Sequence, residues 1–223
     1  MPEFRCVAVE TATARGSVAA CDGGRVVVHV LDNSQTSSRE IFRAVAAVLD
    51  QLALSPGDLD CIAFGCGPGS FTGVRVAASA AQGLAYAKEI PVCRVSSLEA
   101  LAATALRVHP ASTIAACLDA RMGEAFLGVY AQDSSGHLQC ELTDMLIDPQ
   151  RFRLVDDHPG AFAAGAGWEE WPAMLAGHEA GKDGSVWPEA QAVLEIARDM
   201  YACGDVLKAY EALPNYVRDK VTM

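Results

Sequence analysis

Short apolar runs separated by polar turns open the chain, and this pattern predicts strands before any helix. The sequence Asp22-Gly23-Gly24 separates the second run from the third and is typical of a tight hairpin turn. We therefore expect three consecutive antiparallel strands. They lie at Phe4–Val9, Ser17–Cys21 and Val26–Leu31.

Helical spacing begins in the segment Ser38–Leu52, where apolar residues such as Ile41 and Val45 recur on one face. Ser37 and Glu40 have the spacing of a capping box, in which each side chain bonds to the backbone N–H of the other residue. The pattern predicts a helix that starts after Ser37 and ends at Leu52.

The rest of the first half alternates strands with helices, so that it is predicted as βββαβαβα. We expect a strand at Leu59–Phe64, a glycine-rich turn at Gly65–Gly73, a helix at Thr72–Lys88, a strand at Pro91–Val95 and a helix ending at Val108. Ser96 and Glu99 repeat the capping-box spacing at the start of the last helix.

The second half begins like the first. Its predicted strands are Thr113–Leu118, Glu124–Tyr130 and His137–Thr143, and a last helix is predicted from Pro188 to near Gly204. In each half an acidic residue follows the first strand, Glu10 in one and Asp119 in the other, although the sequence itself is not repeated.

We interpret this repeat as a duplicated βββαβα core. It predicts an α/β fold with two subdomains on the actin-like and Hsp70-like (ASKHA, ribonuclease H-like) plan. Residues 1–108 would form the N-terminal subdomain and residues 109–223 the C-terminal one, whose last helix we expect to pack back on the first. In that fold the strand-end acids face the cleft, beside metal and phosphates. The alternative is that Glu10 and Asp119 simply favour turns.

The net charge is −11, from 17 basic and 28 acidic residues. The imbalance lies in the second half, because residues 1–108 hold nine basic and ten acidic side chains, and residues 109–223 hold eight and eighteen. Phosphate backbones repel such a chain, so we do not expect it to bind nucleic acid alone. The near-neutral first half is the half that we expect to face a protein partner.

Eight cysteines are spread along the chain without a C-x-x-C pair, and several stand in apolar strand patterns, where cysteine behaves as a small hydrophobic residue. The N-terminal residues lack a long apolar segment, and no apolar run approaches the ~18 residues that span a membrane. We expect a reduced, cytoplasmic protein that does not enter the membrane.

The glycine-rich stretch Gly65–Gly73 is the most prominent motif. It lacks the glycine spacing and the Lys-Ser/Thr pair of a P-loop. Pro68 and Thr72 occupy the glycine positions of a nucleophile elbow around Ser70, so that motif is excluded as well. A tight structural turn and an anion site at a helix N-terminus remain as interpretations.

No pattern predicts a catalytic or metal site, because the five histidines stand far apart and form no paired metal motif. Asp119 and Arg121 would pair either across a cleft or within their own turn. The weak candidates for binding a cofactor lie in the two acidic turns and the glycine-rich turn. They are Glu10, Thr11, Gly67, Gly69, Ser70 and Asp119.

Several strings together resemble the TsaB (YeaZ-like) family. The most specific is GCGPGSFTGVRVAASAAQGLA, which begins at Gly65. The others are VAVETAT from Val7, RVSSLEALA from Arg94, LDARMGEAFLGVY from Leu118, GAGWEEWP from Gly165 and the tail LPNYVRDKV from Leu213. Their order and the chain length agree along essentially the whole sequence, so the chain is identified as a member of this family.

The resemblance implies a function in the synthesis of the threonylcarbamoyladenosine modification of tRNA. It implies a non-catalytic subunit that dimerises with TsaD, the related subunit that carries an H-x-x-x-H metal site and a nucleotide site. TsaD transfers threonylcarbamoyl to the adenosine beside the anticodon, and TsaE, a P-loop ATPase, joins the complex. The complex would use ATP that this chain does not bind, tRNA would be met only through the complex, and the chain alone would be a homodimer.

Two residues depart from the family pattern. The family's first strand commonly ends in Asp-Thr-Ala, whereas this chain has Glu10. The helix after Ser37 usually opens with a histidine near the position that Ser37 occupies here. Both changes weaken a metal or phosphate function of this chain.

An enzyme of the same fold is the competing interpretation. A metallopeptidase, as in the glycoprotease-like descriptions of the family, is disfavoured by the missing histidine pair. A nucleotide-dependent phosphotransferase needs two phosphate loops and an adenosine loop, of which the sequence carries only traces. A homodimer that exchanges its surface for TsaD is compatible with the activator interpretation.

The resemblance also implies a dimer surface made by the helices Ser38–Leu52 and Thr72–Lys88, two per protomer in a four-helix bundle. The alanines of the second helix permit close packing, and Val74 supplies apolar area. The side chains that we expect in this interface are Ile41, Val45, Val74, Ala77, Ala78 and Ala81.

Overall fold

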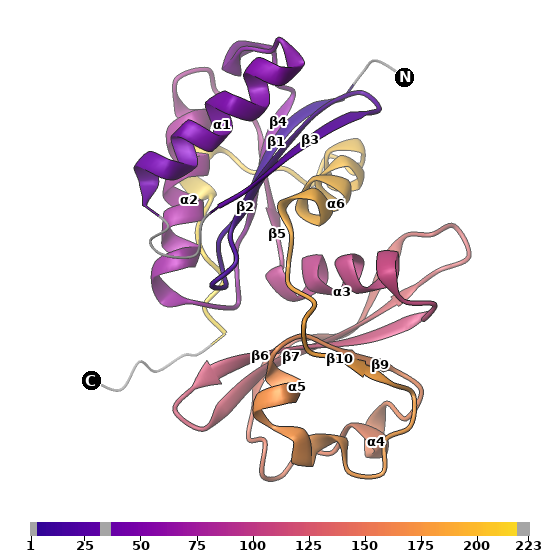
Figure 1. Ribbon diagram of the computed structural model, residues 1–223. Helices are drawn as coiled ribbons and strands as arrows, with labels where there is room; N and C mark the ends of the chain where they lie inside the picture. Colours follow the sequence, from indigo (N-terminus) through magenta and orange to yellow (C-terminus); the bar gives the residue numbers. More distant parts are fainter. Residues whose placement is uncertain (1–3, 32–36, 218–223) are drawn as a thin grey trace.

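The computed structural model describes residues 4–31 and 37–217 of the chain (Figure 1). Two five-stranded sheets divide these residues into two subdomains, one above the other in the view of Figure 1. Helices cover both faces of the first sheet, and one further helix lies between the two sheets. The predicted α/β fold with two subdomains is confirmed.

The first sheet has the strand order β3-β2-β1-β4-β5. Its first three strands form the predicted antiparallel meander, and β4 and β5 run parallel to β1. The strands are β1 (Arg5–Glu10), β2 (Ser17–Asp22), β3 (Arg25–Val30), β4 (Cys61–Gly65) and β5 (Val92–Val95). A short 3₁₀ helix, η1 (Pro56–Asp58), precedes β4.

The second sheet has the order β10-β9-β6-β7-β8, which is the same arrangement. Its strands are β6 (Thr113–Arg121), β7 (Glu124–Gln132), β8 (Leu138–Ile147), β9 (Phe162–Ala164) and β10 (Lys182–Asp183). In each sheet the first strand is central, the second and third extend one edge, and the fourth and fifth extend the other. This correspondence is a duplication of topology, as the repeat of strand-end acids predicted.

The two halves differ in the helices between their strands. The first half has α1 (Ser38–Leu52) and α2 (Phe71–Tyr86), each at least four turns long. At the equivalent places the second half has only α4 (Leu154–Asp157) and α5 (Gly167–Glu170), with η2 (Pro172–Leu175) after them. A single turn has no helical period, so the sequence pattern did not reveal these elements.

The first sheet has a large-residue face and a small-residue face, because successive side chains point to opposite sides of a strand. On β1, Val7 and Val9 pack with α1 and α2, whereas Cys6 and Ala8 face the opposite side. Buried alanines and cysteines continue that second face across four strands. They are Cys6, Ala8, Ala19, Cys21, Cys61, Ala63 and Cys93. The interpretation of the strand cysteines as small hydrophobic residues is confirmed.

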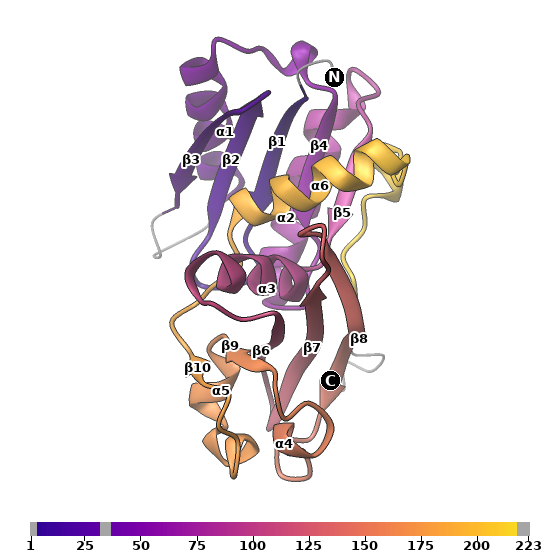
Figure 2. The same cartoon turned by 90° about the vertical axis from the view of Figure 1, so that its right-hand side faces the viewer.

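The third helix of each half packs on the sheet of the other half. Helix α3 (Ser97–Val108) follows the first sheet, yet Leu98 and Leu101 are buried in the core of the second. Helix α6 (Ala190–Cys203) follows the second sheet and lies on the small-residue face of the first (Figure 2). Each subdomain is therefore completed by a helix from the other.

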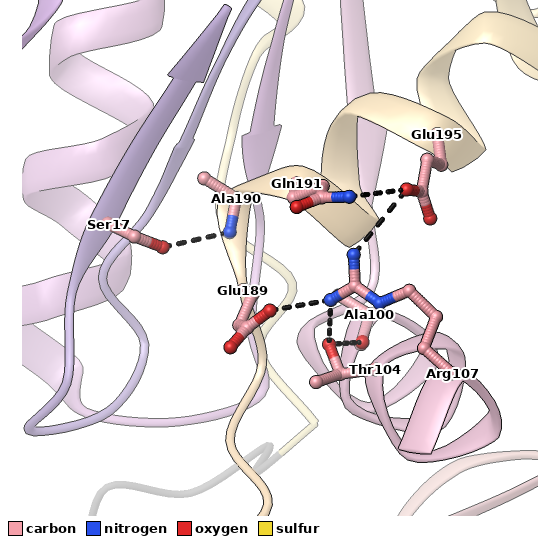
Figure 3. Close-up of polar contacts among 8 residues, drawn as sticks. All are labelled: Ser17, Ala100, Thr104, Arg107, Glu189, Ala190, Gln191 and Glu195. Atoms are coloured by element: carbon pink, nitrogen blue, oxygen red, sulfur yellow. Dashed lines mark hydrogen bonds and ion pairs between the residues drawn. The ribbon is translucent and has the colours of Figure 1, made fainter. Parts of the chain in front are cut away.

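Polar contacts fix the start of α6 (Figure 3). The backbone N–H of Ala190 donates to Ser17 Oγ on β2 at 2.9 Å. Arg107 of α3 donates to the carboxylate of Glu189 at 2.5 Å and to that of Glu195 at 3.4 Å. These bonds join α6 to both the first sheet and α3.

One of the two predicted capping boxes is formed. At α1, Ser37 and Glu40 make both reciprocal bonds, and the helix has the predicted bounds. At α3, Ser96 Oγ accepts from the backbone N–H groups of Leu98 and Glu99, but the Glu99 carboxylate makes no return bond. That half of the prediction is wrong, because the Glu99 side chain instead lines a groove beside α6.

The chain after α6 runs back along α2. The side chain of Gln82 donates to the carbonyl of Ala212 at 3.1 Å, and Asn215 N–H donates to the carbonyl of Cys66 at 2.8 Å. The short helix η3 (Ala209–Glu211) lies in this segment. The string that begins at Leu213 is described as far as Val217, and residues 218–221 lie outside the described residues. Among the described residues, no helix is long and apolar enough to cross a membrane.

Candidate functional site: the interdomain cleft and two outer helices

The strand-end acid Glu10 lies in the protein interior. Its side chain is fully buried, and its carboxylate accepts hydrogen bonds from Ala12 N–H at 2.6 Å and from Ser97 Oγ at 2.8 Å. Burial raises the pKa of Glu10 to about 7, and the two hydrogen bonds oppose that rise. Of the two interpretations of Glu10, the structure therefore contradicts the position facing the cleft and agrees with an acid of the turn, because its oxygens are bonded within the chain and shielded from solvent.

The glycine-rich turn packs directly on the turn after β1. A side chain at Gly73 would place its Cβ 1.9 Å from the carbonyl oxygen of Thr11, and one at Gly69 would place it 2.4 Å from that of Ala12. Ser70 N–H donates to the same Ala12 oxygen at 2.7 Å, and Thr11 Oγ1 donates to the Gly73 carbonyl at 2.8 Å. These glycines admit neighbouring backbone, which favours the structural interpretation of the turn.

Ser97 joins the two turns, and sequence reasoning missed it. Its hydroxyl donates to Glu10 and accepts from Gly67 N–H at 3.2 Å, so one side chain of α3 holds both segments. Ser97 is fully buried. A serine in the first turn of a helix reads as an ordinary cap residue, so no signal in the sequence pointed to this contact.

Asp119 lies in the interdomain cleft, as the fold predicts for a strand-end acid. It lines a cleft of about 570 Å³ between the subdomains, together with Gly69 and Ser70. Its carboxylate accepts from the backbone N–H of Arg121 at 3.0 Å and pairs with the Arg121 guanidinium at 3.2 Å. The structure thus shows the local turn ion pair, one of the two predicted alternatives.

The six weak cofactor candidates separate into two groups. Gly69, Ser70 and Asp119 line the cleft, whereas Glu10, Thr11 and Gly67 are buried and do not line it. The aromatic residues Phe71, Phe126, Trp187 and Tyr216 also line the cleft. In the part of the chain that the structure describes, no group of three or more histidine, cysteine or acidic side chains is arranged to hold a metal ion.

The six predicted interface residues lie in the chain's own interior. They are Ile41, Val45, Val74, Ala77, Ala78 and Ala81, each at most 4% exposed. Five of them belong to the core that α1 and α2 share with the first sheet. Side chains buried in this way are not available to a partner, so any interface on these helices is formed by other residues. The helical period of apolar residues indicates the face of each helix that packs on its own core.

The outer face of α1 and α2 exposes a different set of residues. Phe42 of α1 is 42% exposed and Tyr86 of α2 is 78% exposed. Between them, Ser79 and Gly83 are exposed on α2 one turn apart, and a Cβ at Gly83 would lie 3.7 Å from the Phe42 ring. Phe42 was a usable signal, since it is an aromatic residue outside the apolar stripe of its helix.

Comparison with known proteins connects the chain to one family along its length. The model of the family described as "TsaD: tRNA N6-adenosine threonylcarbamoyltransferase" matches residues 29–153. The chain is 35% identical to the tRNA threonylcarbamoyladenosine biosynthesis protein TsaB of Escherichia coli K12, over 98% of this chain and 96% of that protein. The protein of the same name from Haemophilus influenzae is 31% identical, over 100% and 97%.

A solved structure agrees with these relatives. The structure titled "YeaZ from Pseudomonas aeruginosa" superimposes with a TM-score of 0.89 at 34% sequence identity, over 96% of this chain and 99% of that chain. The similarity therefore includes both subdomains and the helices that they exchange.

Proposed function

Because the chain belongs to the TsaB family of tRNA threonylcarbamoyladenosine biosynthesis proteins, we propose that it serves this modification as a non-catalytic subunit, which dimerises with the transferase TsaD and activates it. The observation that carries the proposal is the closed turn around Glu10. In this fold the strand-end acid is the residue placed to hold a metal or phosphate, and here it is buried and both its oxygens accept hydrogen bonds from the chain itself.

The glycine-rich turn supports the same conclusion. A phosphate-binding turn offers free backbone N–H groups to an anion. Here Ser70 N–H is bonded to Ala12, and Gly73 N–H is bonded to Ser70 Oγ, while the glycines themselves admit the backbone of residues 11 and 12. The turn that would contact a nucleotide is therefore used to hold the subdomain together.

The outer face of α1 and α2 is the surface that we propose for the partner. The TsaD family model matches residues 29–153, a range that contains both helices. Two chains built on the same domain can pair through the same element in a nearly two-fold arrangement. The small residues Ser79 and Gly83 permit a partner helix to approach closely, and Phe42 and Tyr86 supply apolar area at its edges.

The other components act through that complex. We propose that TsaE and TsaD handle ATP, that tRNA is bound mainly by the partner subunits, and that this chain forms a homodimer through the same face when TsaD is absent. The net charge of −11 supports the second point, since a strongly acidic chain is repelled by tRNA.

Reconstitution of the tRNA modification tests the proposal. Purified TsaD, TsaE, ATP and unmodified tRNA would be assayed with this chain, with its Gly83→Arg variant and with a Gly160→Arg control at an exposed glycine outside both grooves. Arginine at Gly83 puts bulk and charge in the centre of the proposed interface, which we expect to weaken pairing by about 100-fold or more. Light scattering, TsaD pull-down and circular dichroism would report on mass, pairing and folding.

Two results would refute the proposal. One is a folded Gly83→Arg variant that pairs with TsaD and activates it as well as the Gly160→Arg control does. The other is magnesium-dependent nucleotide turnover or peptide cleavage by the pure chain, which is lost in a Glu10→Gln variant. The second result would restore the enzyme interpretation.

A further inference from the structure

A second groove, of about 710 Å³, lies between α3, α6 and the β7–β8 turn. Figure 2 shows these three elements side by side, on the opposite face of the first sheet from α1 and α2. Its floor is apolar and includes Leu106, Ile196 and Met200, all partly buried. Leu106 packs with the core of the second sheet and the other two with that of the first, so the floor spans the contact between the subdomains.

The rim of the groove is acidic. Four carboxylates line it, with a single arginine among them. That arginine, Arg107, is already held by Glu189 and Glu195 (Figure 3). His137 is paired with Asp199 at 3.7 Å. Within the described residues, the carboxylates of Glu99 and Asp205 have no hydrogen bond or ion pair, so the rim keeps an excess of negative charge.

Glu99 gives the groove a specific position for a cation. It stands at the third position of α3, where a glutamate normally returns a capping bond, yet its carboxylate lies in the groove without a partner. Burial raises the pKa of Glu99 to about 7, and the negative charge of Asp144 on β8 adds to that rise. A positive group placed against this carboxylate would stabilise its ionised form and relieve the unfavourable burial.

We propose that this groove is a docking site for a short basic, amphipathic segment of a partner protein, with a lysine or arginine head group on Glu99 and an apolar side chain on the floor. Charge complementarity selects this occupant, because four carboxylates on the rim attract a basic segment and repel nucleic acid or an acidic peptide. The apolar floor distinguishes such a segment from a purely polar cation. The site is separate from the outer face of α1 and α2, so it does not depend on the partnership with TsaD.

The probe is a synthetic amphipathic peptide of leucine and lysine, with a second peptide in which glutamate replaces each lysine. Binding to the full chain would be measured by calorimetry, and its position by the methyl NMR signals of Leu106, Ile196 and Met200. The groove pair of substitutions is Glu99→Gln with Asp205→Asn. The matched pair, Glu179→Gln with Asp157→Asn, makes the same two types of substitution at exposed positions outside the groove.

We expect the lysine peptide to shift the three methyl signals and to bind the groove pair at least about tenfold more weakly than the wild type, with less than a twofold loss in the matched pair. The glutamate peptide should not bind. As a second variant, Ile196→Lys brings a cation of the chain itself into the groove and should also abolish binding. Equal losses in the two pairs, undisturbed groove methyl signals, or a lysine peptide that does not bind would each overturn the proposal.

Discussion

Glu10 holds three segments of the first subdomain together. Its carboxylate reaches the turn after β1 through Ala12 and reaches α3 through Ser97, which in turn holds Gly67. The same carboxylate lies so close to β4 that a Cβ at Gly65 would be 1.8 Å from one of its oxygens. In the sequence Glu10 resembles a residue that binds a metal or phosphate, but in the structure its carboxylate accepts hydrogen bonds from the chain itself.

The pH dependence of stability follows from this burial. The pKa of Glu10 rises from the ordinary 4.5 to about 7, so the folded chain binds a proton more tightly than the unfolded chain. The resulting stabilisation is complete below pH 4.5 and is lost as the pH rises towards 7, by roughly 3 kcal/mol in total. Urea unfolding of Glu10→Gln between pH 5 and about 8 should show a flatter free-energy profile than the wild type.

The comparison with wild type is needed because the pKa of Glu99 is also raised to about 7, so Glu99 changes the stability in the same pH range. Its contribution is present in both proteins and cancels in the difference. Wild-type and Glu10→Gln profiles that run parallel between pH 5 and 7 would contradict the burial of an ionisable carboxyl at this position.

At this scale the sequence predicts residue types better than their environments. It identified Glu10, Asp119 and the glycine turn as the positions of interest. The structure places Glu10 at the end of β1 and the glycine turn after β4 as expected, whereas Asp119 lies inside β6, which continues to Arg121. Whether the Glu10 side chain points to the cleft or to the interior depends on Ser97, which is 87 residues away along the chain. A contact of that range leaves no local pattern, so sequence reasoning does not find it.

Helix α2 contains two glycines with opposite requirements. Gly73, in its first turn, lies against the Thr11 carbonyl, whereas Gly83, three turns later, faces open surface beside the Phe42 ring. Both stand at helical positions, so their helix propensities are comparable and their surroundings decide the outcome. Gly73 is therefore required by packing, whereas Gly83 is exposed on the proposed partner surface.

Alanine substitution should therefore act in opposite directions. Gly73→Ala has to displace backbone and should lower the free energy of unfolding by about 2 kcal/mol or more. Gly83→Ala meets only ordinary van der Waals contact and should raise it by about 0.5–1 kcal/mol, from helix propensity. Urea unfolding at a fixed protein concentration measures both, and a Gly73→Ala variant as stable as Gly83→Ala would show that the turn is not packed as described.

Elements with a full period were predictable, and single turns were not. The bounds of α1 agree with the prediction at both ends, because a capping box and an apolar stripe define it. Helix α2 ends at Tyr86, before the predicted Lys88, and the backbone reverses at Glu89 with φ 52°. Helix α6 begins at Ala190 after the predicted Pro188. The apolar period of a helix shows which of its faces is buried, but not which sheet that face contacts. The sequence pattern therefore does not predict that α3 and α6 each pack on the sheet of the other half.

The whole molecule is coupled by that exchange. Helix α3 carries its leucines into the core of the second sheet, and α6 covers the small-residue face of the first. Arg107 and Glu189 then join the two helices to each other. Neither subdomain has a complete core without a segment from the other half of the chain, so the two should unfold together in one cooperative transition.

The tryptophans permit a direct test, since all three lie in the second half, at Trp168, Trp171 and Trp187. Ile62 is fully buried in the core of the first sheet, and Ile62→Ala should cost about 2–4 kcal/mol. If the subdomains are coupled, this change will lower the urea midpoint seen by tryptophan fluorescence as much as that seen by far-ultraviolet circular dichroism. Leu127→Ala, fully buried in the second sheet, is the matched control and should move both signals equally as well. An Ile62→Ala variant whose tryptophan transition stays at the wild-type midpoint while circular dichroism becomes biphasic would mean that α3 and α6 do not transmit stability between the halves.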